Sequence, residues 1–430
     1  MTLRRDVAVL EPDLRRKQCL RCGNEFGCAQ GEPGCWCESI VLSRETLAEL
    51  RTLADDCLCP ACLSGFAERG NGGRTGSTWA KAIPHAAVRA RGVPPVWGVC
   101  ALVFLTGSLL LALGTGPVAI GPAAIARSAL THLPWVRVHR LGALEDAILW
   151  QVRAPRVVLA ALVGGMLAIA GSAYQGVFRN PLADPYLLGV AAGAGLGATI
   201  AIAYAPPGSR AGELLPLSAF VGAILGVGGA YLLGRSVGAA RTSSTLILAG
   251  VTVAAFMTAA QTFVQQQHAQ TLMSVYSWLL GGFGSADWHD VALVFPYIAV
   301  STAVLLLHQR VLDVLSLGDE EAGSLGIDIR RVRLLIVLAA TVGTAAAVSV
   351  SGLIGFVGII VPHTIRLLVS TSYRAVVPLS LLAGAGFLVL ADVIARTALA
   401  PAELPIGVVT AFFGAPFFAL VLRSTRTVPG

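Results

Sequence analysis

Long apolar stretches follow one another from about residue 95 onward, whereas the residues before them are polar and carry both charge signs. A helix needs about 20 mainly apolar residues to cross the hydrocarbon core of a bilayer, so stretches of this length predict membrane spans. A tight turn is expected at 348–352, where the sequence reads Val-Ser-Val-Ser-Gly. We expect ten spans, at approximately 96–116, 154–173, 187–205, 217–234, 246–264, 290–307, 333–350, 352–370, 376–395 and 406–422.

The same polarity pattern divides the chain into three parts. Residues 1–69 contain eight of the nine cysteines, which predicts a small cysteine-rich cytoplasmic domain. Residues 70–94 are rich in glycine, serine and arginine and are expected to be a linker, and residues 95–430 form the membrane domain. The predicted fold class is therefore an all-α polytopic membrane protein with about ten transmembrane helices, preceded by a small cysteine-rich domain that resembles a metal-binding module.

Composition agrees with this fold class and limits the function. Hydrophobic residues make up 55% of the chain and charged residues 13%, against roughly 25% charged residues in soluble domains. The two lysines, Lys17 and Lys81, both precede the first span, so the membrane domain cannot contain a phosphate-binding loop of the G-x-x-x-x-G-K-[ST] kind. We therefore expect no enzyme activity in this chain, and any energy for transport must come from a partner.

The arginines predict the orientation of the chain. An even number of spans puts both termini on one side, and placing them inside leaves eleven loop arginines in the cytoplasm against seven outside. The formal charge of +7 is thus interpreted as loop charge that sets topology and not as a nucleic-acid surface.

A series of motifs in the membrane domain carries a family resemblance. The motifs are R-A-P-R at 153–156, Y-Q-G-V-F-R-N-P-L-A-D-P at 174–185, L-G-D-E-E-A-G-S-L-G-I at 317–327, G-L-I-G-F-V-G-I-I-V-P-H-T-I-R at 352–366, A-D-V-I-A-R at 391–396, and E-L-P-I-G at 403–407. This series strongly resembles the FecCD family, the permease subunits of binding-protein-dependent ABC importers for iron-siderophores, haem and vitamin B12, over about residues 96 to 425. The resemblance implies a homodimer of ten-helix subunits in the bacterial cytoplasmic membrane, two ATP-binding subunits, and an extracytoplasmic substrate-binding protein.

Three arginines are candidates for docking the binding protein. Arg153 and Arg156 flank a proline just before a span, and Arg396 ends another span on the same predicted face. A guanidinium group suits carboxylate recognition because its fork can bind both oxygens. The resemblance implies that these arginines receive acidic residues of the binding protein; the alternative is ordinary snorkelling at the membrane interface.

The resemblance also implies a cytoplasmic gate and a coupling segment. Asn180 and Leu182 would form one half of the gate, and Ser243 and Ser244 the other half; the alternative is that Asn180 and Leu182 lie in a mere connector. A short half-helix is expected by resemblance between 265 and 288. An amphipathic cytoplasmic stretch at 315–327 would contact the ATPase, unless it is only a solvated loop. The coupling residues are Leu317, Gly318, Asp319, Glu320, Glu321, Leu325 and Gly326.

Eight cysteines near the N-terminus have the spacing C-x2-C-x5-C-x6-C-x-C-x19-C-x-C-x2-C, which resembles the small cysteine-rich CWC domain. Eight thiols could fill two tetrahedral four-thiolate sites, and zinc is the expected ion. An iron–sulfur centre and redox-active thiols are the alternatives. If the head rather than the spans carries the function, the protein would be a membrane-anchored metal or redox sensor. The candidate ligands are Cys19, Cys22, Cys28, Cys35, Cys37, Cys57, Cys59 and Cys62.

Overall fold

The chain forms two compact units, Met1–Ala87 and Val88–Gly430, in a computed structural model. The two units are described separately, and the predicted bounds of head, linker and membrane domain stay predictions. The structure describes residues 15–19, 22, 25–28, 50, 58–60, 62–63, 92–131, 142–205, 211–236, 243–318, 322–323 and 328–426.

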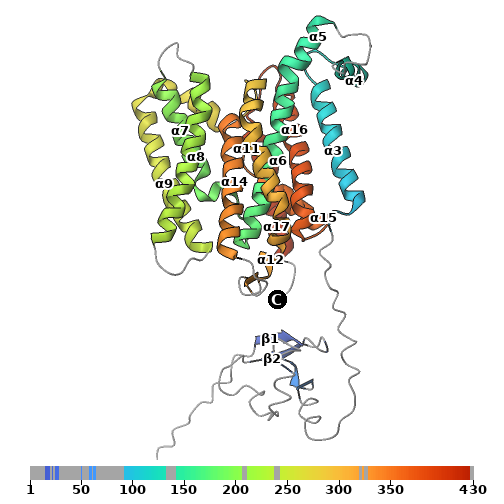
Figure 1. The fold of residues 1–430 in the computed structure, drawn as a ribbon, viewed down its shortest axis with the longest axis vertical. Helices are drawn as coiled ribbons and strands as arrows, with labels where there is room; N and C mark the ends of the chain where they lie inside the picture. Colours follow the sequence, from blue (N-terminus) through green and yellow to red (C-terminus); the bar gives the residue numbers. More distant parts are fainter. Residues whose placement is uncertain are drawn as a thin grey trace, which may run out of the picture. The chain divides into compact units, whose positions relative to one another are not determined.

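Ten apolar helices form the body of the second unit in the part of the chain that the structure describes (Figure 1). Seven are long and apolar enough to cross a membrane: α3 (Pro95–Gly114), α6 (Ala154–Phe178), α8 (Ala211–Ser236), α9 (Ser243–Gln267), α11 (Trp288–Leu307), α14 (Ile329–Ser351) and α16 (Tyr373–Thr397). Three more are shorter or less regular: α7 (Val190–Tyr204), α15 (Val357–Leu368) and α17 (Ile406–Arg426). Each coincides with one expected span, which confirms the predicted fold class.

Short helices connect the spans. The expected half-helix between 265 and 288 is present as α10, whereas α4 and α12 were not predicted from the apolar pattern. The short elements are α4 (Pro122–Thr131), α5 (Ala143–Ala147), the π-helical turn η3 (Ile148–Arg153), η4 (Pro185–Leu188), η5 (Ala269–Thr271), α10 (Leu272–Leu279) and α12 (Gln309–Leu317).

The turn predicted at 348–352 is wrong in position. Helix α14 continues through Ser351, because the Ser349 and Ser351 hydroxyls donate to carbonyl oxygens in the preceding turn and are compatible with a helix. The chain leaves the helix at Gly352, whose φ of 69° favours glycine. A side chain there would also overlap the carbonyl oxygen of Trp278.

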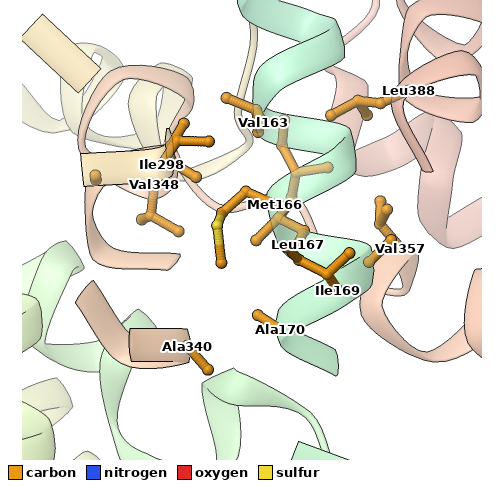
Figure 2. Close-up of a cluster of buried hydrophobic side chains, with 14 of the residues drawn as sticks. Val163, Met166, Leu167, Ile169, Ala170, Ile298, Ala340, Val348, Val357 and Leu388 are labelled. Atoms are coloured by element: carbon orange, nitrogen blue, oxygen red, sulfur yellow. The ribbon is translucent and has the colours of Figure 1, made fainter. Parts of the chain in front are cut away.

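Helix α6 forms the centre of the membrane unit. In an 18-residue apolar window of the span that ends at Phe178, 83% of the residues are buried, whereas in the corresponding window of α3 only 11% are. Figure 2 shows α6 side chains surrounded by those of four other helices. The labelled members are Val163, Met166, Leu167, Ile169 and Ala170 of α6, Ile298 of α11, Ala340 and Val348 of α14, Val357 of α15, and Leu388 of α16.

Glycines bring α6 into backbone contact with its neighbours. A Cβ atom on Gly171 would overlap the carbonyl oxygen of Gly358 in α15, so position 171 requires the absence of a side chain. Lipid offers little hydrophobic driving force for helix association, and close backbone approach provides the van der Waals contact instead. The same Gly358 oxygen accepts a 3.0 Å hydrogen bond from the Gln175 side chain.

The first unit contains a small hairpin among its described residues. Strand β1 (Arg15–Gln18) pairs antiparallel with β2 (Glu25–Cys28), with Arg15 opposite Cys28 and Gln18 opposite Glu25. Strand β1 ends just before Cys19 and β2 begins after Cys22, so these two cysteines lie in the connection between the strands.

Gly171→Ala should destabilise the membrane unit, because the added methyl group must push α6 away from α15. Overpacking of this kind costs about 1–3 kcal/mol in well-packed interiors. Gly107→Ala in α3 is the matched control, since a Cβ there meets nothing within 4 Å. Thermal unfolding of the detergent-purified variants should show a lower midpoint for Gly171→Ala alone; equal midpoints would contradict the packing argument.

Candidate functional site

A cluster of charged side chains lies at one end of the membrane unit, where α3 and α16 end and α17 begins. We call this the outer end and the opposite end the inner end, following the predicted orientation. Arg156 is at the centre of the cluster. Its guanidinium group donates to both carboxylate oxygens of Asp392, at 2.8 to 3.1 Å, and to both oxygens of Glu403, at 2.9 Å.

The other two predicted docking arginines cap α3. Arg153 donates to the carbonyl oxygens of Leu113, at 2.8 Å, and of Val118, and Arg396 donates to the carbonyl oxygen of Ala112. The last carbonyl groups of a helix lack intrahelical partners and carry partial negative charge, so arginines at this position satisfy and stabilise the helix end. Arg396 also pairs with Asp392, at 3.6 Å.

Burial differs sharply within this outer charge cluster. Arg153 and Arg156 are only 4% and 9% exposed, and Asp392 is 1% exposed. The Glu403 side chain is 47% exposed and closes the cluster toward the surface. Its hydrogen bonds with the Arg156 guanidinium lower the pKa of the Glu403 carboxyl, so this group is ionised at neutral pH.

The structure thus brings the three predicted arginines into one cluster and gives each of them partners within the chain. Docking stays a prediction. Arg156 is buried and bonded to the half-exposed Glu403, so an external carboxylate would have to compete with Glu403 for this guanidinium group.

The inner end contains the predicted gate residues. After α6 ends, the Asn180 side chain accepts a 2.9 Å hydrogen bond from the backbone N–H of Leu182, which forms a tight turn, and the Leu182 side chain is exposed. Ser243 and Ser244 are the first residues of α9, and their side chains lie outside the described part of the structure. The segment that follows Leu182, η4, contacts α9, where a Cβ on Gly250 would overlap the carbonyl oxygen of Leu187. The gate assignment remains a prediction.

A pocket of about 250 Å³ lies beside Asn180. Arg366 lines this pocket, donates a 2.6 Å hydrogen bond to the Gln175 side chain and lies over the ring of Tyr373, 5.4 Å from its centre. These contacts join α6, α15 and the start of α16, so these three helices contribute to the wall of this pocket.

Helix α12 leads into the predicted coupling segment. Its Leu312 and Leu315 are buried, and Asp313 accepts a 2.8 Å hydrogen bond from the Ser372 hydroxyl and another from the backbone N–H of Tyr373. The N-terminus of α16 is thereby attached to α12. Gly318 follows directly and is buried. The Leu317 side chain and the predicted contacts Asp319, Glu320, Glu321, Leu325 and Gly326 lie outside the described residues, so the coupling assignment stays a prediction.

In the head, four of the eight cysteines form one cluster. The sulfur atoms of Cys19, Cys22, Cys59 and Cys62 all lie within 4.8 Å of one another. Two of them, Cys19 and Cys59, are buried, and the Cys59 N–H donates to the Cys19 sulfur at 3.3 Å.

This cysteine cluster suits a soft cation. Four thiolates on two C-x2-C segments are a usual donor set for structural zinc. Burial is the main cause that raises the pKa of the Cys62 thiol to about 12, and hydrogen bonds with the other three thiols add to it. Without a cation this thiol therefore stays protonated. A bound cation would reverse that preference. The side chains of Cys28, Cys35, Cys37 and Cys57 lie outside the described part of the chain.

Three acidic residues of these sites were not identified from the sequence. Asp392 stands four residues before Arg396, a spacing that signals an ion pair on a helix. Glu403 and Asp313 carry no comparable local signal, since their partners Arg156 and Ser372 are 247 and 59 residues away in the chain.

Known proteins resemble both units. The model of the FecCD transport family matches residues 102–424, and that of the cysteine-rich CWC family matches residues 19–64. The cobalamin import system permease protein BtuC of Halobacterium salinarum (strain ATCC 700922 / JCM 11081 / NRC-1) is 38% identical over 358 residues, covering 76% of this chain and 95% of that protein. The ABC transporter permease protein YvrB of Bacillus subtilis (strain 168) is 42% identical over 278 residues, covering 64% and 78%.

A solved structure agrees with these relatives. An ABC transporter of the metal-chelate type, in an inward-facing conformation, matches with a TM-score of 0.67 and 28% identity over 77% of this chain and all of its own. The region that matches the family includes every apolar helix from α6 to α16. The chain is a multi-pass membrane protein that belongs to the FecCD transport family of ABC importer permeases.

Proposed function

We propose that this chain is the permease subunit of an importer that moves cobalamin across the cytoplasmic membrane, with its termini in the cytoplasm. The observation that carries the proposal is the likeness to the Halobacterium cobalamin permease over 95% of that protein's length. The vitamin B12 import system permease protein BtuC of Salmonella paratyphi A (strain ATCC 9150 / SARB42), which is 40% identical over 288 residues, supports the same substrate. An iron chelate, either a siderophore or haem, is the second substrate class, favoured by the likeness to the metal-chelate type transporter.

The proposed assembly contains two copies of this chain, two ATP-binding subunits at the inner end and a binding protein at the outer end. The resemblance to the FecCD family supports the proposal of a second copy. Large apolar side chains of α9 and α17 are exposed, with Phe256 at 74% and Phe412 at 75%, and either lipid or the second copy would cover them. The lack of lysine after residue 81 supports ATP hydrolysis by a separate subunit, since the phosphate-binding loop requires a lysine.

In this assembly the energy enters at the inner end. ATP binding closes the partner subunits against the segment 317–326, and α12 passes the displacement to α16 through Asp313. The gate formed by Asn180, Leu182, Ser243 and Ser244 then opens or closes the inner mouth. The outer charge cluster, with Arg153, Arg156 and Arg396, positions the acidic residues of the binding protein.

A second candidate function is a membrane-anchored metal or redox sensor that uses the head. The four-cysteine cluster favours it, because a permease has no evident need for such a site. We propose zinc as the ion at Cys19, Cys22, Cys59 and Cys62, where it would supply structural cross-linking of the two C-x2-C segments.

The purified chain in liposomes should show no accumulation of cobalamin against a gradient, because its sequence contains no G-x-x-x-x-G-K-[ST] loop. Co-reconstitution with an ATPase subunit and a loaded binding protein should give ATP-dependent uptake of radiolabelled cobalamin. Ferric siderophore and haem, tested in the same vesicles, separate the two substrate classes. Accumulation by the chain alone would overturn the proposed mechanism.

Arg156→Glu should weaken association with the binding protein at least about tenfold, the equivalent of about 1.4 kcal/mol. Because this change also places a carboxylate beside Asp392, Arg156→Lys is needed as a second variant: it keeps the charge but loses the fork. Arg331→Glu at the inner end is the control, since that side chain is 88% exposed and far from the cluster in sequence and position. Binding measured by interferometry on nanodiscs should fall for both Arg156 variants; unchanged binding with an unchanged unfolding midpoint would refute docking at this cluster.

Full-length protein purified without chelators should contain zinc, and Cys19→Ser with Cys59→Ser should lose one ion per chain. Cys100→Ser is the control, because Cys100 lies exposed in α3. Elemental analysis measures the loss. Cobalamin uptake by the double variant then separates the candidates, since a permease should keep its transport activity and a sensor should lose its function.

A further inference from the structure

A second cavity at the inner end has apolar walls. Its volume is about 380 Å³, within the range of roughly 300–1,000 Å³ that ligand pockets span. Helix α8 contributes Val227 and Ala230, and α14 contributes Leu334 and Val337. On each helix these residues recur at the spacing of one face, so the cavity runs along the two helices instead of lying in a single loop.

Arginines stand at the rim of this cavity. Arg235 lies in the last turn of α8, and Arg330 and Arg333 lie on one face of the first turns of α14. The Arg235 guanidinium is 5.9 Å from the ring centre of Tyr231, which also lines the cavity. Among the described residues that line it, none is acidic. The N-terminus of α14 is capped by Asp328, whose side chain accepts a hydrogen bond from the Arg331 N–H and does not line the cavity, so the arginine side chains alone supply the positive charge.

We infer that an anionic phospholipid of the inner leaflet occupies this cavity, with its phosphate against Arg235, Arg330 and Arg333 and one acyl chain along α8 and α14. An apolar interior below a basic rim is complementary to an amphiphile with a negative head. Basic pockets between transmembrane helices on the cytoplasmic side bind acidic lipid headgroups. A soluble anion would use the arginines but leave the apolar walls in contact with water.

The position gives such a lipid a structural role. The cavity is bordered by the start of α9, through Leu246, and by Phe178 and Leu188 on either side of the connector that contains Asn180. A lipid held there packs against α6, α8, α9 and α14 at once. The inference does not depend on the identity of the transported substrate.

The test uses the full chain purified in a mild detergent and mixed with phosphatidylglycerol or phosphatidylcholine of the same acyl chains. Native mass spectrometry should show retained phosphatidylglycerol, and added phosphatidylglycerol should raise the unfolding midpoint more than phosphatidylcholine does. Changing Arg235, Arg330 and Arg333 to Gln should lower retention, by roughly fivefold for each arginine removed. Ala230→Trp, which fills the apolar part, should lower retention while leaving the rim charge unchanged.

Arg331→Gln is the matched control, because Arg331 is the sequence neighbour of Arg330 but is paired with Asp328 at 2.9 Å and does not line the cavity. It should retain phosphatidylglycerol as the wild type does. Equal loss in the control, or equal retention of both lipids, would overturn the inference. Stabilisation by inorganic phosphate alone would instead indicate a soluble anion, and displacement of the lipid by cobalamin would assign the cavity to the transport pathway; either result would also overturn it.

Discussion

The membrane unit depends on the close approach of helix backbones around α6. In a bilayer, apolar side chains gain little by leaving lipid for protein, so association requires dense packing and hydrogen bonds. Glycines at the crossing of α6 and α15 allow the dense packing, and the Gln175 side chain donates a hydrogen bond to the Gly358 carbonyl oxygen.

Charge is buried at the outer end only where it has several partners. Arg156 and Asp392 would each be costly alone in an apolar surrounding, but the bidentate contact satisfies both. Arg153 and Arg396 satisfy the carbonyl groups that end α3. The cluster therefore joins α3, α6, α16 and the loop at Glu403, and the surface that a binding protein would meet is held by this network.

The apolar pattern predicted the ten helices well, because span length is set by the bilayer and is visible in a single sequence. It misplaced the turn before α15, since serines are compatible with a helix when their hydroxyls bond to the preceding turn. The surroundings of the arginines could not be predicted, because the partners of Arg156 are 236 and 247 residues away. In the head, spacing identified all eight cysteines as candidates, but only the positions of the sulfur atoms show that the two C-x2-C pairs meet.

Helix α16 runs as one continuous helix between the inner and outer ends of the membrane unit. Its 25 residues span about 37 Å at 1.5 Å per residue. Asp313 holds one tip through Ser372 and Tyr373, and Asp392 and Arg396 anchor the other. A tilt imposed at the inner tip of α16 would therefore displace Asp392 and Arg396 at its outer tip, because both tips belong to one continuous helix.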